Sequence, residues 1–176
     1  DWIVPGIRIQ NAELRITGAT VDPDEHEWAD HTTYEQLAAT RLLAEQRPSS
    51  RTALRFYAPT SFKWGQQTIP VPLPDLVYGG LVDKWNVWSN VAVSEEMRRF
   101  AVEGVGMSRY QLETHAVRGR GKSMQIGFMG VCQFTALDKD RYWVSILQML
   151  TDYAFYAGIG YQTTRGMGQA RRVDAQ

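Results

Sequence analysis

The segment from residue 158 to residue 168 combines four glycines with two threonines and an arginine. Glycine allows positive φ and lets a ligand approach the main chain, and exposed backbone N–H groups in such a turn bind anions. This composition predicts a phosphate site with the arginine as its charged partner. The alternative is a helix cap followed by a plain turn. The residues concerned are Gly158, Gly160, Thr163, Thr164, Arg165, Gly166 and Gly168.

Further cations occur at two other places in the chain. Arg118, Arg120 and Lys122 alternate with glycines, which is typical of the tip of a β-hairpin. Such a tip can follow a phosphate backbone, although most charge clusters of this kind are solvated turns. Lys63 beside Trp64 offers a cation and a stacking surface, while Trp64 could equally belong to the core.

The three histidines are candidate proton carriers. His26 and His31 lie in or beside an acidic stretch from Asp22 to Asp30, where a carboxylate and imidazole metal site is conceivable but the spacing is irregular. A solvated loop is favoured there, so we predict no metal site. His115 is the histidine closest to the basic tip. A surface or packing role is favoured for His115, and a role as the catalytic base is the alternative.

Composition limits the possible functions. Lysine and arginine total 19, as do aspartate and glutamate, so a nucleic-acid surface must come from local clustering. Cys132 is the single cysteine and lies in an apolar run, which predicts a buried thiol and neither a disulfide nor a cysteine metal site. There is no Gly-x-x-x-x-Gly-Lys-Ser/Thr loop for a nucleotide.

The sequence also has no long apolar run and no N-terminal targeting segment. We therefore expect a cytoplasmic protein without membrane contact and without a cofactor. The first residue is Asp1 and not methionine, which suggests a fragment of a longer protein.

Hydrophobic periodicity predicts the elements that hold these residues. Alternation predicts a strand or strand pair over 7–16, a strand over 52–57, two strands around the basic tip between 108 and 137, and a closing strand at 169–173. Helical spacing predicts helices over 32–47, 73–88, 94–105 and 141–157. If residues from about 63 to 106 are a helical insertion between the second and third strands, the order is β-α-β-β-α-β. We therefore predict an α+β, ferredoxin-like domain over 1–176, the fold that RNA-recognition domains also use.

Four motifs resemble those of one protein family. They are Phe56-Tyr57-Ala58-Pro59-Thr60-Ser61-Phe62, Leu73-Pro74-Asp75-Leu76-Val77-Tyr78 leading into Trp85, Gly127-Phe128-Met129-Gly130, and Tyr156-Ala157-Gly158-Ile159-Gly160 continuing through Thr163-Thr164-Arg165-Gly166-Met167-Gly168. In this order they resemble the C-terminal half of the CRISPR-associated repeat-cleaving endoribonucleases, the Cas six family of the RAMP superfamily. The resemblance covers residues 7–173.

The resemblance implies two tandem ferredoxin-like domains, with this chain as the C-terminal one and the N-terminal one upstream. It implies binding of CRISPR repeat RNA and cleavage of one phosphodiester without a metal or cofactor. The upstream 2′-OH would attack the phosphate and give a 2′,3′-cyclic phosphate. In this family the glycine-rich loop and a hairpin bear on the RNA, whereas the histidine usually comes from the first domain. The catalytic residues are therefore expected mainly outside this chain.

Two other functions fit the same residues. A non-catalytic RAMP subunit would hold guide RNA inside an effector complex and leave it intact. A structural or protein-interaction module would use the glycine-rich segment only as a turn. Apolar helices in the 73–105 region could also serve a homodimer or a contact with effector-complex subunits.

Overall fold

The computed structural model describes residues 6–9, 12–118 and 124–175, and the chain divides into two compact units. The first unit, residues 1–33, contains an antiparallel hairpin of β1 (Gly6–Ile9) and β2 (Ala12–Arg15). All four β2 side chains are exposed, and Arg8 pairs with Glu13 at 2.8 Å. The predicted strand pair over 7–16 is therefore a separate two-stranded sheet.

The second unit is built on a four-stranded antiparallel sheet with the order β6-β7-β3-β8. Its elements have the β-α-β-β-α-β order of the ferredoxin-like fold, which confirms the predicted α+β class. In chain order they are β3 (Arg51–Thr60), α2 (Pro74–Trp88), β6 (Val105–Arg118), β7 (Met124–Ala136), α4 (Arg141–Ala157) and β8 (Ala170–Val173).

This order begins at β3, and not at the predicted strand over 7–16. The helices expected as an insertion, α2 and α3 (Glu96–Gly104), therefore form the first crossover of the fold itself. The added segment is shorter, a hairpin of β4 (Phe62–Trp64) and β5 (Gln67–Ile69). Burial explains the difference, because α2 supplies core side chains whereas those of β2 are exposed. The core residues of α2 are Val77, Tyr78, Leu81, Val82 and Trp85.

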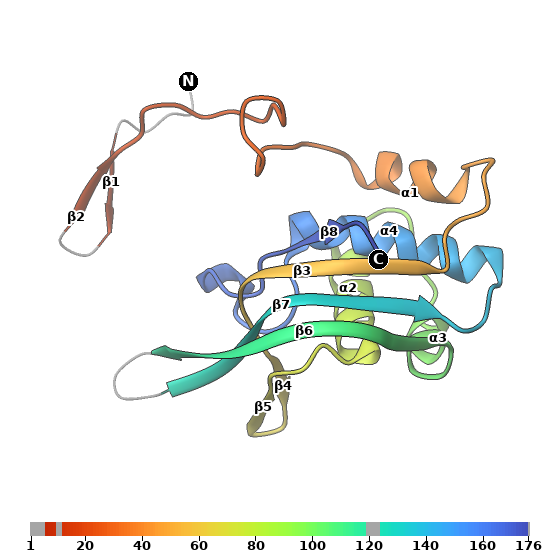
Figure 1. Ribbon diagram of the computed structural model, residues 1–176. Helices are drawn as coiled ribbons and strands as arrows, with labels where there is room; N and C mark the ends of the chain where they lie inside the picture. The colour runs from red at the N-terminus through yellow and green to blue at the C-terminus, as the bar shows by residue number, and fades with distance from the viewer. Residues whose placement is uncertain (1–5, 10–11, 119–123, 176) are drawn as a thin grey trace. The chain divides into compact units, whose positions relative to one another are not determined.

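One face of the sheet packs against α2 and α4 to form the core (Figure 1). Tyr78 of α2 meets Phe134 of β7 edge-on, with ring centroids 5.4 Å apart. Cys132 is buried in the same layer, as predicted, and burial raises the pKa of its thiol to about 12. None of the helices in the described ranges combines the length and apolar character that crossing a bilayer requires.

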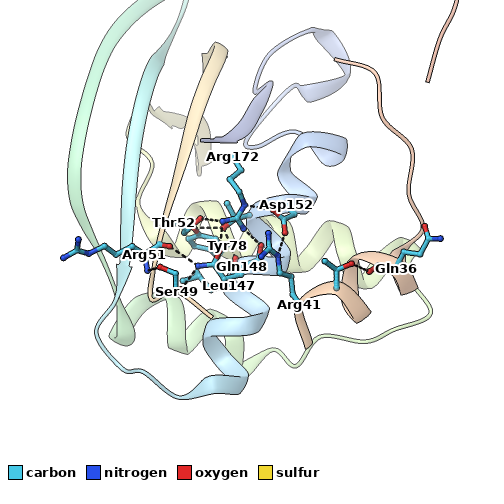
Figure 2. A network of polar contacts seen from close by, with 12 residues as sticks. Gln36, Arg41, Ser49, Arg51, Thr52, Tyr78, Leu147, Gln148, Asp152 and Arg172 are labelled. Carbon is cyan, nitrogen blue, oxygen red and sulfur yellow. Dashed lines mark hydrogen bonds and ion pairs between the residues drawn. The ribbon is translucent and has the colours of Figure 1, made fainter. Parts of the chain in front are cut away.

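A network of charged and polar side chains joins α1 (Tyr34–Leu42), α4 and β8 (Figure 2). Asp152 on α4 accepts hydrogen bonds from Arg41 on α1, at 2.6 Å, and from Arg172 on β8. Arg172 also donates to the Gln148 side chain at 2.6 Å and to Thr52 on β3 at 3.1 Å. The network therefore fixes β8, which follows the glycine-rich segment, against α4 and the adjacent strand β3.

Candidate nucleic-acid interface

Residues 158–168, the glycine loop, connect α4 to β8. At the end of α4, Gly158 adopts a φ of 63° and its N–H donates to the carbonyl oxygen of Ala154. Lys84 on α2 donates from Nζ to the carbonyl oxygens of Ala157 and Gly158, at 3.1 and 2.9 Å. The start of the glycine loop is therefore fixed by a side chain of α2.

Three of the four glycines in this loop pack closely against other atoms of the chain. A Cβ at Gly158, Gly160 or Gly168 would come within 3.0 Å of another atom, and for Gly160 that atom is the Ser61 carbonyl oxygen at 2.5 Å. Gly166 differs, because a Cβ there would meet nothing within 4 Å among the described atoms. Among these four positions, the space beside Gly166 is therefore the one open to a ligand.

Thr163–Arg165 form a short 3₁₀ turn, η1, between the glycines. Thr164 and Arg165 are exposed and Thr163 is partly exposed. Within the described ranges, the two threonine hydroxyls make no hydrogen bond and Arg165 forms no ion pair. The turn therefore presents hydroxyl groups and a guanidinium to solvent, which are donors that bind phosphate oxygens.

The glycine loop packs on the end of β3. The Gly168 N–H donates to the carbonyl oxygen of Pro59 at 3.1 Å, and the Tyr161 N–H donates to that of Ser61 at 2.8 Å. Gln125 on β7 also binds Ser61, because its Nε2 donates a hydrogen bond to Ser61 Oγ at 2.8 Å. Motifs that are distant in the sequence therefore meet at one end of the sheet (Figure 1).

Two of the predicted cations lie at this end of the sheet. Lys63 on β4 is exposed and forms no ion pair in the described part of the chain. Arg118 ends β6, one register step from Gln125, whereas Arg120 and Lys122 fall outside the described residues. We refer to the exposed or partly exposed groups of η1 and the glycine after it, of β4 and of the end of β6 together as the loop surface. Its members are Lys63, Arg118, Thr163, Thr164, Arg165 and Gly166.

Comparison with known proteins identifies the family. Residues 54–170, more than half of the chain, match the profile of the CRISPR-associated endoribonuclease Cas6. The chain belongs to the Cas6 family. The resemblance that the four motifs suggested is thereby confirmed. A search of curated protein sequences finds no match.

Solved Cas6 structures share the fold of this chain. A Thermus thermophilus Cas6 is 25% identical, with a TM-score of 0.76 over 87% of this chain and 63% of that one. A Cas6 product complex is 26% identical, with a TM-score of 0.82 over 96% of this chain and 66% of that one. A Cas6 substrate mimic complex is 28% identical, with a TM-score of 0.72 over 93% and 64%. The chain therefore spans less than two thirds of the length of these relatives.

His115 of this Cas6-family chain is not among the residues that line the hollow beside the glycine loop. His115 on β6 lines a hollow of about 360 Å³ on the sheet, together with Arg55, Tyr57 and Glu113, and a separate hollow lies beside the glycine loop. His115 as the catalytic base therefore stays a prediction.

The acidic stretch in the first unit is held by local hydrogen bonds. His26 Nδ1 accepts the Trp28 N–H at 3.1 Å, and Asp30 Oδ1 accepts the His31 N–H at 2.7 Å. No group of three metal-ligating side chains comes together among the residues that the structure describes.

Sequence reasoning missed Lys84, which holds the start of the glycine loop. The signal was a lone lysine on a helix whose neighbours Leu81, Val82 and Trp85 are core residues. Burial lowers the pKa of Lys84, and within the described ranges it pairs with no carboxylate. It thus places a positive charge at the C-terminal end of α4, where the helix dipole is negative.

Proposed function

We propose that this chain binds the repeat of a precursor CRISPR RNA at the loop surface. The observation that carries the proposal is the set of unengaged donors on η1, where two threonine hydroxyls and Arg165 face solvent beside Gly166. Lys63 adds a second cation without an ion pair in the described chain. Membership of the Cas6 family and likeness to Cas6 product and substrate mimic complexes support RNA as the ligand.

The proposed reaction is metal-independent cleavage at one phosphodiester. The 2′-OH of the upstream ribose attacks the phosphorus, the bond to the 5′-oxygen breaks, and the products carry a 2′,3′-cyclic phosphate and a 5′-OH. Arg165 holds the RNA backbone, and the hydroxyl groups of η1 add hydrogen bonds to the RNA that help to position the repeat. A base must take the 2′-OH proton and an acid must protonate the leaving oxygen. We place these groups mainly in the remainder of the whole protein.

The test is to incubate the whole protein with repeat RNA in EDTA and to map the product ends. We expect a single cut with a 5′-OH on one fragment and a cyclic phosphate on the other. A matched RNA with 2′-deoxyribose at the upstream nucleotide should bind but stay intact. Cleavage that requires an added metal ion, or that leaves a 5′-phosphate, would contradict the proposed chemistry.

A second candidate is a non-catalytic RAMP subunit that holds guide RNA in an effector complex. One observation favours it, since the described side chains around the hollow beside the glycine loop include neither a histidine nor a carboxylate. The same experiment separates the two functions, because this subunit would bind the RNA and leave it intact. Contacts with effector subunits or a second copy of the chain stay predictions.

A further inference from the structure

A hollow of about 360 Å³ lies between the last turn of α4 and η1. Aromatic side chains and the end of α4 line one part of it, and η1 with the residues that follow lines the rest. The residues that matter for its chemistry are Tyr156, Thr163, Thr164, Gly166 and Gln169. We propose that this hollow binds one unpaired nucleobase of the RNA, next to the phosphate at Arg165. The inference rests on the proposed function, because it names a second contact with the same RNA.

The size and rigidity of the hollow suit a flat heterocycle. Small-molecule sites begin at about 300 Å³, so there is room for a base. Tyr156 is 39% exposed, and its ring meets Phe155 edge-on with centroids 5.0 Å apart. The guanidinium of Arg171 lies 5.8 Å from the centre of the Phe155 ring. The aromatic wall is therefore held in place before a ligand arrives, and a base stacked on it loses little to ordering of the protein.

The polar groups of the hollow match the edge of a base. Threonine hydroxyls and the Gln169 amide can each donate and accept hydrogen bonds, as base edges require. No charged side chain is among the described residues that line the hollow. A phosphate placed inside it would therefore lack a counter-charge, whereas a neutral base would not need one.

The hollow and the proposed phosphate contact are adjacent along the chain. Arg165 lies between Thr164 and Gly166, which both line the hollow, although Arg165 itself does not. A nucleotide joins its base to its phosphate through a single ribose, so one nucleotide can occupy both positions. The base must be unpaired, because both of its faces are already stacked inside a duplex.

The experiment compares Tyr156→Ala with Tyr142→Ala, a control at the exposed start of the same helix, where Tyr142 is 51% exposed. Affinity of the whole protein is measured for repeat RNA and for a series of repeats in which each nucleotide in turn is abasic. We expect Tyr156→Ala to weaken binding about 5- to 100-fold and Tyr142→Ala to leave it unchanged. One of the abasic repeats should bind the parent protein with a similar loss of affinity. The same repeat should bind Tyr156→Ala no more weakly than the intact repeat does.

A second variant, Thr163→Val, removes a hydroxyl with little change in shape and serves if Tyr156→Ala unfolds. It should also show reduced coupling to the same abasic position. If Arg165→Ala weakens binding but no abasic position couples to Tyr156 or Thr163, the nucleobase site is wrong and the proposed function stands. If the parent protein does not bind repeat RNA, the proposed function fails and the nucleobase site fails with it.

Discussion

The ammonium group of Lys84 donates a hydrogen bond to the carbonyl oxygen of Gly158 at 2.9 Å and so connects α2 to the first residue of the glycine loop. A second bond, to Ala157 at 3.1 Å, engages another carbonyl at the end of α4. Carbonyl groups at a helix C-terminus lack partners within the helix, and a cation there also favours the helix dipole. Lys84 is therefore a positioning residue for the loop surface.

Replacing Lys84 with methionine should destabilise the fold and weaken RNA binding together. We expect the free energy of unfolding to fall by about 1–2 kcal/mol, because two carbonyl groups lose a charged donor. Denaturant unfolding and RNA titration measure the two effects. Lys139→Met, at an exposed position before α4, is the control and should change neither. A Lys84→Met protein with parent affinity would show that the loop surface does not depend on this contact.

Gly160→Ala and Gly166→Ala should have different consequences. At Gly160 the new Cβ would overlap the Ser61 carbonyl oxygen, which also accepts the Tyr161 N–H, so we expect the larger loss of stability there. At Gly166 we expect a loss of about 1–2 kcal/mol from the positive φ alone, with a clear loss of RNA affinity because the open space is filled. Thermal unfolding and RNA titration of both variants test this. Equal loss of stability in the two would contradict the assigned packing.

Removing a single cation of the loop surface should reduce the salt dependence of RNA binding. Arg165→Ala and Lys63→Ala should each lower the slope of log affinity against log salt by about 0.7 if each contacts one phosphate of single-stranded RNA. Arg99→Ala is the matched control, because Arg99 lies on α3 and pairs with Glu96 at 2.9 Å. An unchanged slope for both variants would show that neither Arg165 nor Lys63 contacts a phosphate of the RNA.

Asp152→Ala should destabilise the second unit. Its carboxylate accepts hydrogen bonds from Arg41 and Arg172 and is only 20% exposed, so its removal leaves two partly buried cations without their partner. We expect a loss of about 1.5–3 kcal/mol in urea unfolding. Glu103→Ala, which removes an exposed carboxylate 4.0 Å from Arg99, should cause no measurable loss. Equal losses would mean that the network in Figure 2 contributes no more than a surface ion pair.

Stability should fall at alkaline pH through Cys132. Because burial raises the pKa of its thiol from 9.0 to about 12, the folded state keeps its proton where the unfolded state loses it. The stability that the protonated Cys132 thiol contributes is fully present below pH 9 and is lost as pH rises from about 9 towards 12. Between pH 8 and 10 the parent protein should lose about 1 kcal/mol more than Cys132→Ala in urea unfolding. Comparing the two proteins cancels the pH dependence that comes from other titrating groups. Lys84 is one of them, and its lowered pKa makes stability rise with pH. Parallel pH profiles would contradict a buried thiol.

The β-α-β-β-α-β order could be predicted from the sequence. Which strands and helices of the chain make up that order could not. Alternation over Ile7–Leu14 correctly predicts strands, yet it does not reveal whether they join the main sheet or pair only with each other. That choice depends on contacts between distant residues, such as Leu54 with Cys132 across β3 and β7. Local periodicity therefore led to the fold class and misplaced its first strand.

The candidate site was predicted in part for the same reason. The glycine spacing predicts a candidate site at residues 158–168. The sequence does not show that Gly160 is packed against the chain whereas Gly166 is open. The difference lies in what a Cβ would meet, and Ser61 comes from a different part of the chain. Lys84 was missed because its acceptors are backbone carbonyls, which have no sequence signature.

The pairing of β3 with β8 also constrains how the protein is made. Arg172 on β8 bonds Thr52 on β3 across 120 residues of sequence, and the glycine loop immediately precedes β8. During synthesis β3 leaves the ribosome before β8, and the edge of β3 that pairs with β8 stays unpaired until β8 has emerged. A nascent chain therefore has no formed glycine loop, and the proposed RNA site can exist only after this segment has been translated.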